Sequence, residues 1–257
     1  MGDLACNGVR LHVQRLGTGA PAVVFLHGLL MDNLSSWYFT VANAVATRRE
    51  ALLYDLRGHG MSERPAAGFD LDTHIADLAA LLAVAGLDRP VALVGNSFGG
   101  LLAIAFAIAR PERVARIALV DALLPEPGWG DAMGATLSIQ GPERDAVIAR
   151  SFASWLGRNS ERKRNRLARQ AEALVAETTL VADLRRSRSY RDEELAAIAC
   201  PVLAIYGEAS DQRDRGERLA RTLPRCTLEL LPGCSHSVLW EATARLRDRI
   251  VAFTGDA

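Results

Sequence analysis

The sequence predicts an α/β protein with a mostly parallel, doubly wound sheet, and three features predict it. Short apolar segments alternate with helical patterns along most of the chain. These segments are bounded by glycine, proline and polar residues, as buried strands are. The 257 residues suffice for one large domain, and 49% of them are hydrophobic. Such alternation is typical of parallel strands covered by helices on both faces.

The first half of the chain supplies most of the predicted elements. A hairpin is predicted over 4–16, because Asn7-Gly8 is a strong turn signal. Helical spacing of apolar residues over 71–85 predicts a helix, with Asp70 or Asp72 as its N-cap. Further strands are predicted at 22–26, 51–54, 91–94 and 114–120, and further helices at 34–46 and, after Ser97, at 101–109.

A long segment without any predicted strand follows. Residues 122–199 begin with breaks at Gly128, Gly130 and Gly134 and continue as amphipathic helices at about 143–156, 161–187 and 191–198. An insertion at the C-terminal side of sheet strands usually lies over the active site, so we predict a helical cap. The predicted core is then 1–121 and 200–257, with strands at 202–206 and 227–231 and a closing helix over 238–253.

The most informative motif is Gly95-Asn96-Ser97-Phe98-Gly99, which fits G-x-S-x-G between a strand and a helix. The turn strains the serine backbone and leaves no room for side chains two residues away on either side. Ser97 at a helix N-terminus is therefore the predicted nucleophile. The alternative is a glycine-rich turn without chemistry.

A serine nucleophile needs a base and an orienting acid. His236, in the loop after the last predicted strand, is the candidate base. Asp211, in the loop after the strand at 202–206, is the preferred acid. Asp121, at the end of the strand at 114–120, is its main rival, and Glu208 is a weaker one.

The reaction also needs donors for an oxyanion. The backbone N–H of Phe98 is the first candidate. The second is the N–H of Leu29, because Gly28 lets this loop approach closely. We interpret His27, beside it, as a structural histidine.

Several segments together resemble the α/β-hydrolase superfamily: His27-Gly28, Asp55-Leu56-Arg57-Gly58-His59-Gly60-Met61-Ser62, the glycine-flanked serine motif, and the loops of Gly207 and His236. The resemblance omits only the insertion. It implies an α/β-hydrolase fold with a cap, a serine mechanism without cofactor or metal, and a scaffold role for His59. The motif at 95–100 and the stretch 234–241 are similar to those of carbon–carbon bond hydrolases that cleave ring-fission products. Asp211 falls one residue later than the usual acid of the family, and the loop 29–37 departs from its small, glycine-rich form.

Composition limits the partners. The formal net charge is zero, which argues against nucleic acid. The four cysteines are scattered without zinc-ligand spacing, and no signal peptide is visible, so a cytoplasmic protein is expected. Residues 91–109 carry no charge, but their glycines favour a buried strand, turn and helix over a membrane span.

The predicted cap is rich in arginine, which would attract an anionic substrate, including a coenzyme A or carrier-protein thioester, or form a solvated face. The arginines are Arg158, Arg162, Arg164, Arg166, Arg169, Arg185, Arg186, Arg188 and Arg191. The large aromatic residues would line an apolar pocket or belong to the core. They are Trp37, Trp129, Phe152, Trp155 and Trp240.

Together these features predict a cofactor-free serine hydrolase that cleaves an ester, a thioester or an activated carbon–carbon bond of a hydrophobic small molecule. Two other hypotheses remain open at this point: a natural-product synthase or lyase on the same fold, and a ligand receptor that retains the triad.

Overall fold

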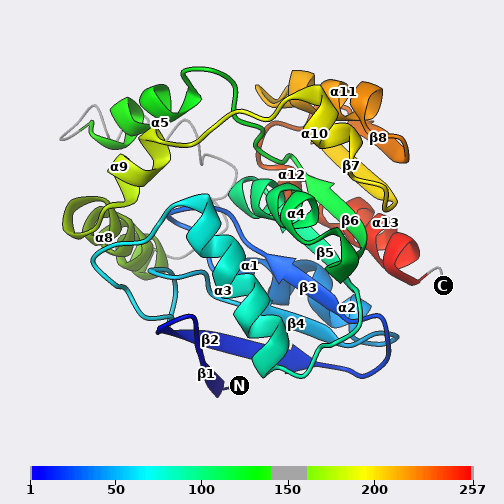
Figure 1. The fold of residues 1–257 in the computed structure, drawn as a ribbon, viewed down its shortest axis with the longest axis horizontal. Coiled ribbons are helices and arrows are strands. Elements are labelled where there is room, and N and C mark those ends of the chain that lie inside the picture. Colours follow the sequence, from blue (N-terminus) through cyan, green and yellow to red (C-terminus); the bar gives the residue numbers. More distant parts are fainter. Residues whose placement is uncertain (1, 140–160, 256–257) are drawn as a thin grey trace.

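The computed structural model describes residues 2–139 and 161–255. Its centre is an eight-stranded sheet in the order β1-β2-β4-β3-β5-β6-β7-β8 (Figure 1). The β1–β2 and β2–β4 pairs are antiparallel, and all other pairs are parallel. The strands are Gly2–Cys6 (β1), Val9–Leu16 (β2), Val23–Leu26 (β3), Ala51–Tyr54 (β4), Val91–Asn96 (β5), Val114–Val120 (β6), Val202–Gly207 (β7) and Cys226–Leu231 (β8). The predicted α/β-hydrolase fold, with its mostly parallel sheet, is confirmed.

Helices cover both faces of this sheet, because its central strands are apolar on both sides. One face packs against α3 (Leu71–Val84) and α4 (Phe98–Ala109), which lie in front of the sheet in Figure 1. The other face packs against the helical segment over 35–45 and against α12 (Val238–Glu241) and α13 (Thr243–Gly255). The segment over 35–45 comprises α1 (Ser35–Trp37), η1 (Tyr38–Ala42) and α2 (Asn43–Val45). A 3-10 turn, η2 (Pro111–Arg113), precedes β6, and α11 (Arg213–Thr222) joins β7 to β8.

Most boundaries agree with the sequence, and Asp70 is the N-cap of α3, since its side chain accepts a hydrogen bond from the N–H of Thr73 at 2.9 Å. Two kinds of prediction need correction. The first concerns helices that are interrupted: the closing helix is two helices, because the backbone of Ala242 leaves the helical conformation, and the helix predicted over 161–187 is also two, Glu161–Glu177 and Leu180–Arg185. The predicted helix at 143–156 lies outside the described residues.

The second correction concerns the glycines after residue 122, which do not all interrupt the chain. Gly130 and Gly134 lie inside a helix, α5 (Trp129–Leu137). A Cβ at Gly130 would collide with the carbonyl oxygen of Leu184, and one at Gly134 with the side chain of Arg185. These glycines therefore allow α5 to pack closely on α9 (Leu180–Arg185).

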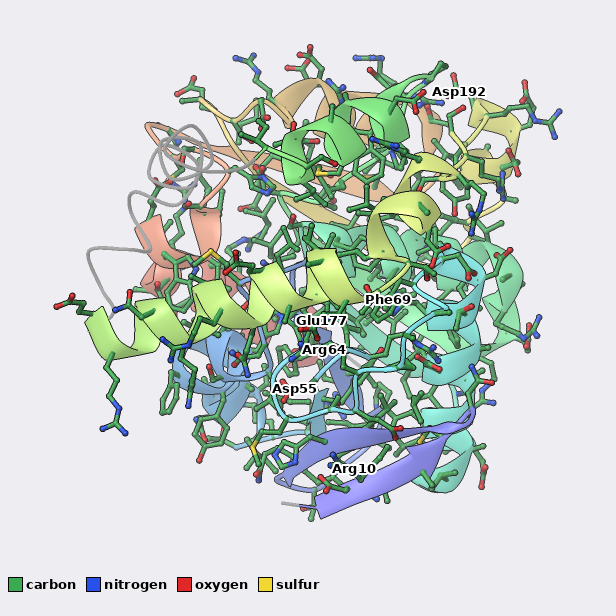
Figure 2. The ribbon with its side chains drawn as sticks, turned by 90° about the vertical axis from the view of Figure 1, so that its left-hand side faces the viewer. Arg10, Asp55, Arg64, Phe69, Glu177 and Asp192 are labelled. Atoms are coloured by element: carbon green, nitrogen blue, oxygen red, sulfur yellow. The ribbon has the colours of Figure 1, made fainter. Side chains whose placement is uncertain are left out.

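In the described part of the segment between β6 and β7, the remaining helices are α8 (Glu161–Glu177) and α10 (Asp192–Ala196). Figure 1 shows α5, α8 and α9 grouped at one end of the molecule, away from α13. Several contacts fasten this group to the sheet domain; among them, Arg64 forms an ion pair with Glu177 at 3.4 Å, and the N–H of Phe69 donates to Asp183 at 2.8 Å. Figure 2 shows Arg64 and Glu177 close together, with Phe69 nearby at the same end of α8.

No helix in the described parts of the chain has both the length and the apolar character needed to cross a membrane.

Candidate active site

The turn between β5 and α4 holds Ser97 in a strained conformation. Its backbone angles are φ 51° and ψ −119°, a region that side-chain-bearing residues rarely adopt. A Cβ at Gly95 would meet the carbonyl group of Gly99, and a Cβ at Gly99 would meet the carbonyl group of Leu26 in β3. The two glycines are thus required for the close contact between turn and sheet, as the motif predicts.

His236 reaches Ser97 from the loop after β8. The distance from Ser97 Oγ to His236 Nε2 is 3.1 Å, so the hydroxyl can donate to a neutral imidazole. This loop is braced by Glu241, whose carboxylate accepts hydrogen bonds from the backbone N–H and the hydroxyl of Ser235 at 2.7 and 2.8 Å. A further bond, from Ala209 N–H to the Cys234 carbonyl at 2.9 Å, joins it to the loop after β7.

The carboxylate that contacts His236 is Asp121, and the preference for Asp211 is corrected. The Nδ1–H of His236 donates to Asp121 Oδ2 at 2.6 Å. Asp121 directly follows β6, and Val120, the last residue of β6, pairs with Asn96, the residue before Ser97. This register places the carboxylate of Asp121 level with Ser97. The side chain of Asp121 is only 1% exposed.

Asp211 instead lies in the exposed part of the loop after β7, where it lines the cavity beside His236. Among the described residues it forms no hydrogen bond with the imidazole. Residue 210, the position at which the acid of similar proteins was expected, is a serine, and its hydroxyl donates to Asp121 Oδ2 at 2.5 Å. The N–H of Gly207 donates to Asp121 Oδ1 at 2.8 Å.

The environment of His236 favours its protonated form. Burial on its own lowers the pKa of His236, but the hydrogen bond and the charge of Asp121, together with the charges of Asp211 and Glu241, outweigh it. The net result is a pKa above the ordinary value. An imidazole of this kind can take a proton from a serine hydroxyl and return it to a leaving group.

The loop after β3 lies against Ser97. A Cβ placed on Gly28 would be only 3.6 Å from the Cβ of Ser97. The N–H of Gly28 donates to Asp32 at 2.8 Å, and the N–H of Leu30 donates to His59 Nε2 at 2.9 Å. Between these two anchored groups, the N–H of Leu29 has no acceptor among the described residues.

Two buried histidines, His27 and His59, are neutral and form hydrogen bonds that hold that loop in place. Burial lowers the pKa of His27 to about 4 and that of His59 to about 3. A neutral imidazole keeps one nitrogen as an acceptor, and the N–H of Leu56 donates to His27 Nε2 at 2.9 Å. The interpretation of both as scaffold residues agrees with these contacts. Phe98, the other candidate donor, is the first residue of α4, where backbone N–H groups have no helical acceptor.

A cavity of about 1590 Å³ contains Ser97 and His236 in its wall. Most of its lining is apolar and comes from the segment after β6 and from α5, α8, α9 and α12; examples are Leu123, Trp129, Met133, Val175, Val181 and Trp240. Of the aromatic residues singled out in the sequence, Trp129 and Trp240 thus face the cavity, whereas Trp37 is buried in the core and Phe152 and Trp155 lie outside the described residues.

The described arginines of the insertion differ in their surroundings. Arg186, Arg188 and Arg191 form ion pairs with Asp183 or Glu194, as expected of a solvated face. Arg169 on α8 lines the cavity and has no ion pair among the described residues. Arg158 is outside those residues. The charged side chains that line the cavity are Asp32, Arg169, Glu172, Asp211 and Arg215.

Sequence reasoning missed two residues of this site, Asp32 and Ser210. Asp32 accepts from the backbone of the loop after β3, and Ser210 contacts the carboxylate of Asp121. Neither residue carries a motif of its own. The spacing after Gly207 could have drawn attention to Ser210, since that is the expected position of an acid.

Comparisons with known proteins identify relatives along the whole chain. A 2-hydroxy-6-oxononadienedioate/2-hydroxy-6-oxononatrienedioate hydrolase of Cupriavidus pinatubonensis is 28% identical over 96% of this chain and 91% of its own length. A 2-hydroxy-6-oxo-2,4-heptadienoate hydrolase of Pseudomonas putida is 37% identical, but over only 46% of this chain and 42% of that enzyme.

Solved structures share the fold. A meta-cleavage product hydrolase superposes with a TM-score of 0.79 at 22% identity, covering 100% of this chain and 98% of that one. The enol-lactonase from Burkholderia xenovorans gives 0.79 at 24% identity, covering 99% and 100%. The model of the alpha/beta hydrolase fold family matches residues 21–199, which is more than half of the chain. The chain therefore belongs to the alpha/beta hydrolase fold family and is an enzyme of that family.

Proposed function

We propose that the protein is a serine hydrolase that acts on an ester, a thioester or an activated carbon–carbon bond of a largely apolar small molecule. The observation that carries the proposal is the continuous contact from Ser97 Oγ to His236 Nε2, 3.1 Å, and from His236 Nδ1 to Asp121 Oδ2, 2.6 Å. A nucleophile, a base and an orienting acid in this geometry are the groups that acyl transfer requires.

In the proposed mechanism, Ser97 attacks a carbonyl carbon while His236 accepts its proton. Asp121 keeps the imidazole oriented and stabilises its charge. The N–H groups of Leu29 and Phe98 bind the oxyanion, and the positive end of α4 adds to this stabilisation. His236 then protonates the leaving group, and water, activated by the same imidazole, releases the acid from Ser97. No step requires a cofactor.

The helices α5, α8 and α9 act as a cap in this proposal. They supply most of the apolar wall of the cavity and exclude water from the bound substrate. Contacts with the sheet domain, including those of Arg64 with Glu177 and of Phe69 with Asp183, hold them in place.

Among the bonds named in this proposal, the carbon–carbon bond of an oxo acid is the more specific candidate, and one observation favours it over a simple ester. Arg169, which is exposed on α8 and has no ion pair among the described residues, lines a mostly apolar cavity, where its guanidinium could bind a substrate carboxylate. The curated relatives are named for dienoate and dienedioate substrates, which carry such groups. In this chemistry the triad would first assist ketonisation of the dienol.

The first test compares hydrolysis of p-nitrophenyl acetate by the wild type, by Ser97→Ala and by Ser187→Ala. Ser187 lies outside the cavity lining, so its variant is a matched control. We expect kcat/KM to fall by about 10⁴-fold or more in Ser97→Ala and to stay within about twofold in Ser187→Ala. A fluorophosphonate should label the wild type but not Ser97→Ala. Equal turnover in a folded Ser97→Ala variant would contradict the proposal.

The two candidate substrate classes are then separated with Arg169→Gln. If the substrate is an oxo dienoate, this variant should raise KM for it by about 10-fold or more and leave KM for p-nitrophenyl acetate unchanged, since a hydrogen bond to a charged group contributes about 1.5–3 kcal/mol. An unchanged KM for the dienoate would exclude this role of Arg169.

A further inference from the structure

The end of β7 and the loop after it supply two hydrogen-bond donors to the carboxylate of Asp121, the residue that directly follows β6. Asp121 Oδ1 accepts from the N–H of Gly207, and Oδ2 accepts from the hydroxyl of Ser210. Oδ2 also accepts the Nδ1–H of His236. Ser210 and His236 therefore share one oxygen of Asp121.

The hydroxyl of Ser210 has no freedom to donate elsewhere. Its oxygen accepts the N–H of Gln212 at 3.0 Å, and its hydrogen points to Asp121 at 2.5 Å. The residue is 9% exposed, so water does not compete readily for this bond. Its N–H donates to the Gly207 carbonyl at 3.1 Å, which fixes the turn from the backbone.

We propose that Ser210 is a positioning residue of the triad: its hydroxyl restrains the carboxylate of Asp121 toward His236 and withdraws part of the negative charge that the imidazole would otherwise receive. The role of the triad in this inference rests on the proposed function. A donor on the shared oxygen stabilises the carboxylate and so weakens its pull on the imidazolium. Ser210 thus keeps His236 neutral over a wider range of pH, as a general base must be.

Removal of this hydroxyl should raise the pKa of His236. Asp121 stays near His236, although less firmly restrained, because Gly207 still holds Oδ1 and the side chain is buried. The other charged groups that act on His236 are Asp211 in the loop before α11 and Glu241 in α12, and the substitution leaves both unchanged. A loss of packing alone would lower the free energy of unfolding without raising the pKa of His236.

The test measures the titration of His236 by NMR in histidine-labelled protein, with His236→Asn to assign its signal. His27, His59 and His74 do not interfere, because burial lowers their pKa to about 4, 3 and 3. In Ser210→Ala we expect the pKa of His236 to rise by about half a unit, less than the full effect of one charged hydrogen bond. Ser210→Thr, which keeps a hydroxyl, should restore the wild-type value.

Thr254→Val in α13 is the matched control, since it also removes a buried hydroxyl, one that donates to a backbone carbonyl at 2.7 Å. Its His236 titration should equal that of the wild type. A His236 pKa in Ser210→Ala that is unchanged or lower would overturn the proposal. This readout needs no substrate, so it can fail or succeed independently of hydrolysis.

Kinetics provide the second readout. The acid limb of kcat/KM for p-nitrophenyl acetate should move to higher pH in Ser210→Ala by the same half unit or so, and kcat on the plateau should fall by about 3- to 10-fold with little change in KM. If the wild type itself shows no Ser97-dependent turnover, the proposed function fails while the titration still decides the role of Ser210. A rise in KM at constant kcat would contradict it.

Discussion

Asp121→Asn is the substitution that tests the corrected triad most directly. Three donors converge on the two oxygens of Asp121: Gly207 N–H on one, and Ser210 O–H and His236 Nδ1–H on the other. Asparagine has one acceptor oxygen and one NH₂ group. Either the NH₂ group faces the N–H of Gly207, donor against donor, or it faces the imidazole.

The second arrangement would abolish the base. If an amide NH₂ donates to Nδ1, the imidazole must carry its proton on Nε2, which can then no longer accept the proton of Ser97. The equivalent change in a serine protease costs about 10⁴-fold in kcat, or about 5.5 kcal/mol, and it acts through the wrong tautomer. For Asp121→Asn we expect a loss of about 10³- to 10⁴-fold in kcat.

Asp211→Asn is the matched comparison, because it neutralises a carboxylate of the same cavity that makes no hydrogen bond to His236. We expect kcat within about threefold of the wild type, since only a charge interaction across a partly exposed region is lost. Asp211 contributes to the raised pKa of His236. Its neutralisation should therefore move the acid limb of the pH profile to lower pH.

The assay is kcat/KM for p-nitrophenyl acetate from pH 5 to 9, with circular dichroism to show that each variant is folded. In the wild type, activity should fall as the pH drops through a His236 pKa that lies above its ordinary value. The assignment would be refuted if Asp211→Asn lost activity by 10³-fold or more while Asp121→Asn stayed within about 10-fold of the wild type.

Two further predictions concern stability. Gly99→Ala should lower the free energy of unfolding by about 3 kcal/mol or more or prevent folding, because its Cβ would collide with the carbonyl of Leu26; urea unfolding measures this. Arg57→Ala should cost about 3–5 kcal/mol, since it leaves the carboxylate of Asp77 buried and unpaired, and the double variant Arg57→Met, Asp77→Leu should regain much of that loss. Equal urea midpoints for Arg57→Ala and the wild type would contradict the second.

The fold was predictable because its signals are local. Each central strand is a short apolar segment, and each major helix of the first half has apolar residues at helical spacing. The errors arose where tertiary contacts decide. Gly130 and Gly134 resemble helix breakers in sequence, but in the structure they are the positions where α5 meets the backbone of Leu184 and the side chain of Arg185. A pattern of single residues does not contain that contact.

The proposed nucleophile, Ser97, and the proposed base, His236, were predictable for a similar reason. Ser97 lies in a motif whose strand–turn–helix context is visible in the sequence, and His236 is placed by chain order. The acid was not, because Asp121 and Asp211 both follow a predicted strand. The choice depends on register: Val120 pairs with Asn96, which puts Asp121 next to the nucleophile, and such pairing between distant segments is set by packing.

The position of the acid has a consequence for the loop after β7. With the carboxylate directly after β6, the end of β7 and the loop that follows need only donate hydrogen bonds to it, which Gly207 and Ser210 do. Its next residue, Asp211, then faces the cavity with a charge that is not needed to orient the base. If both proposals hold, Ser210 adjusts the pKa of His236 through Asp121, while Asp211 contacts the substrate in the cavity. Substitutions at Asp211 should then change which substrates are accepted more than they change the rate at which any one of them reacts.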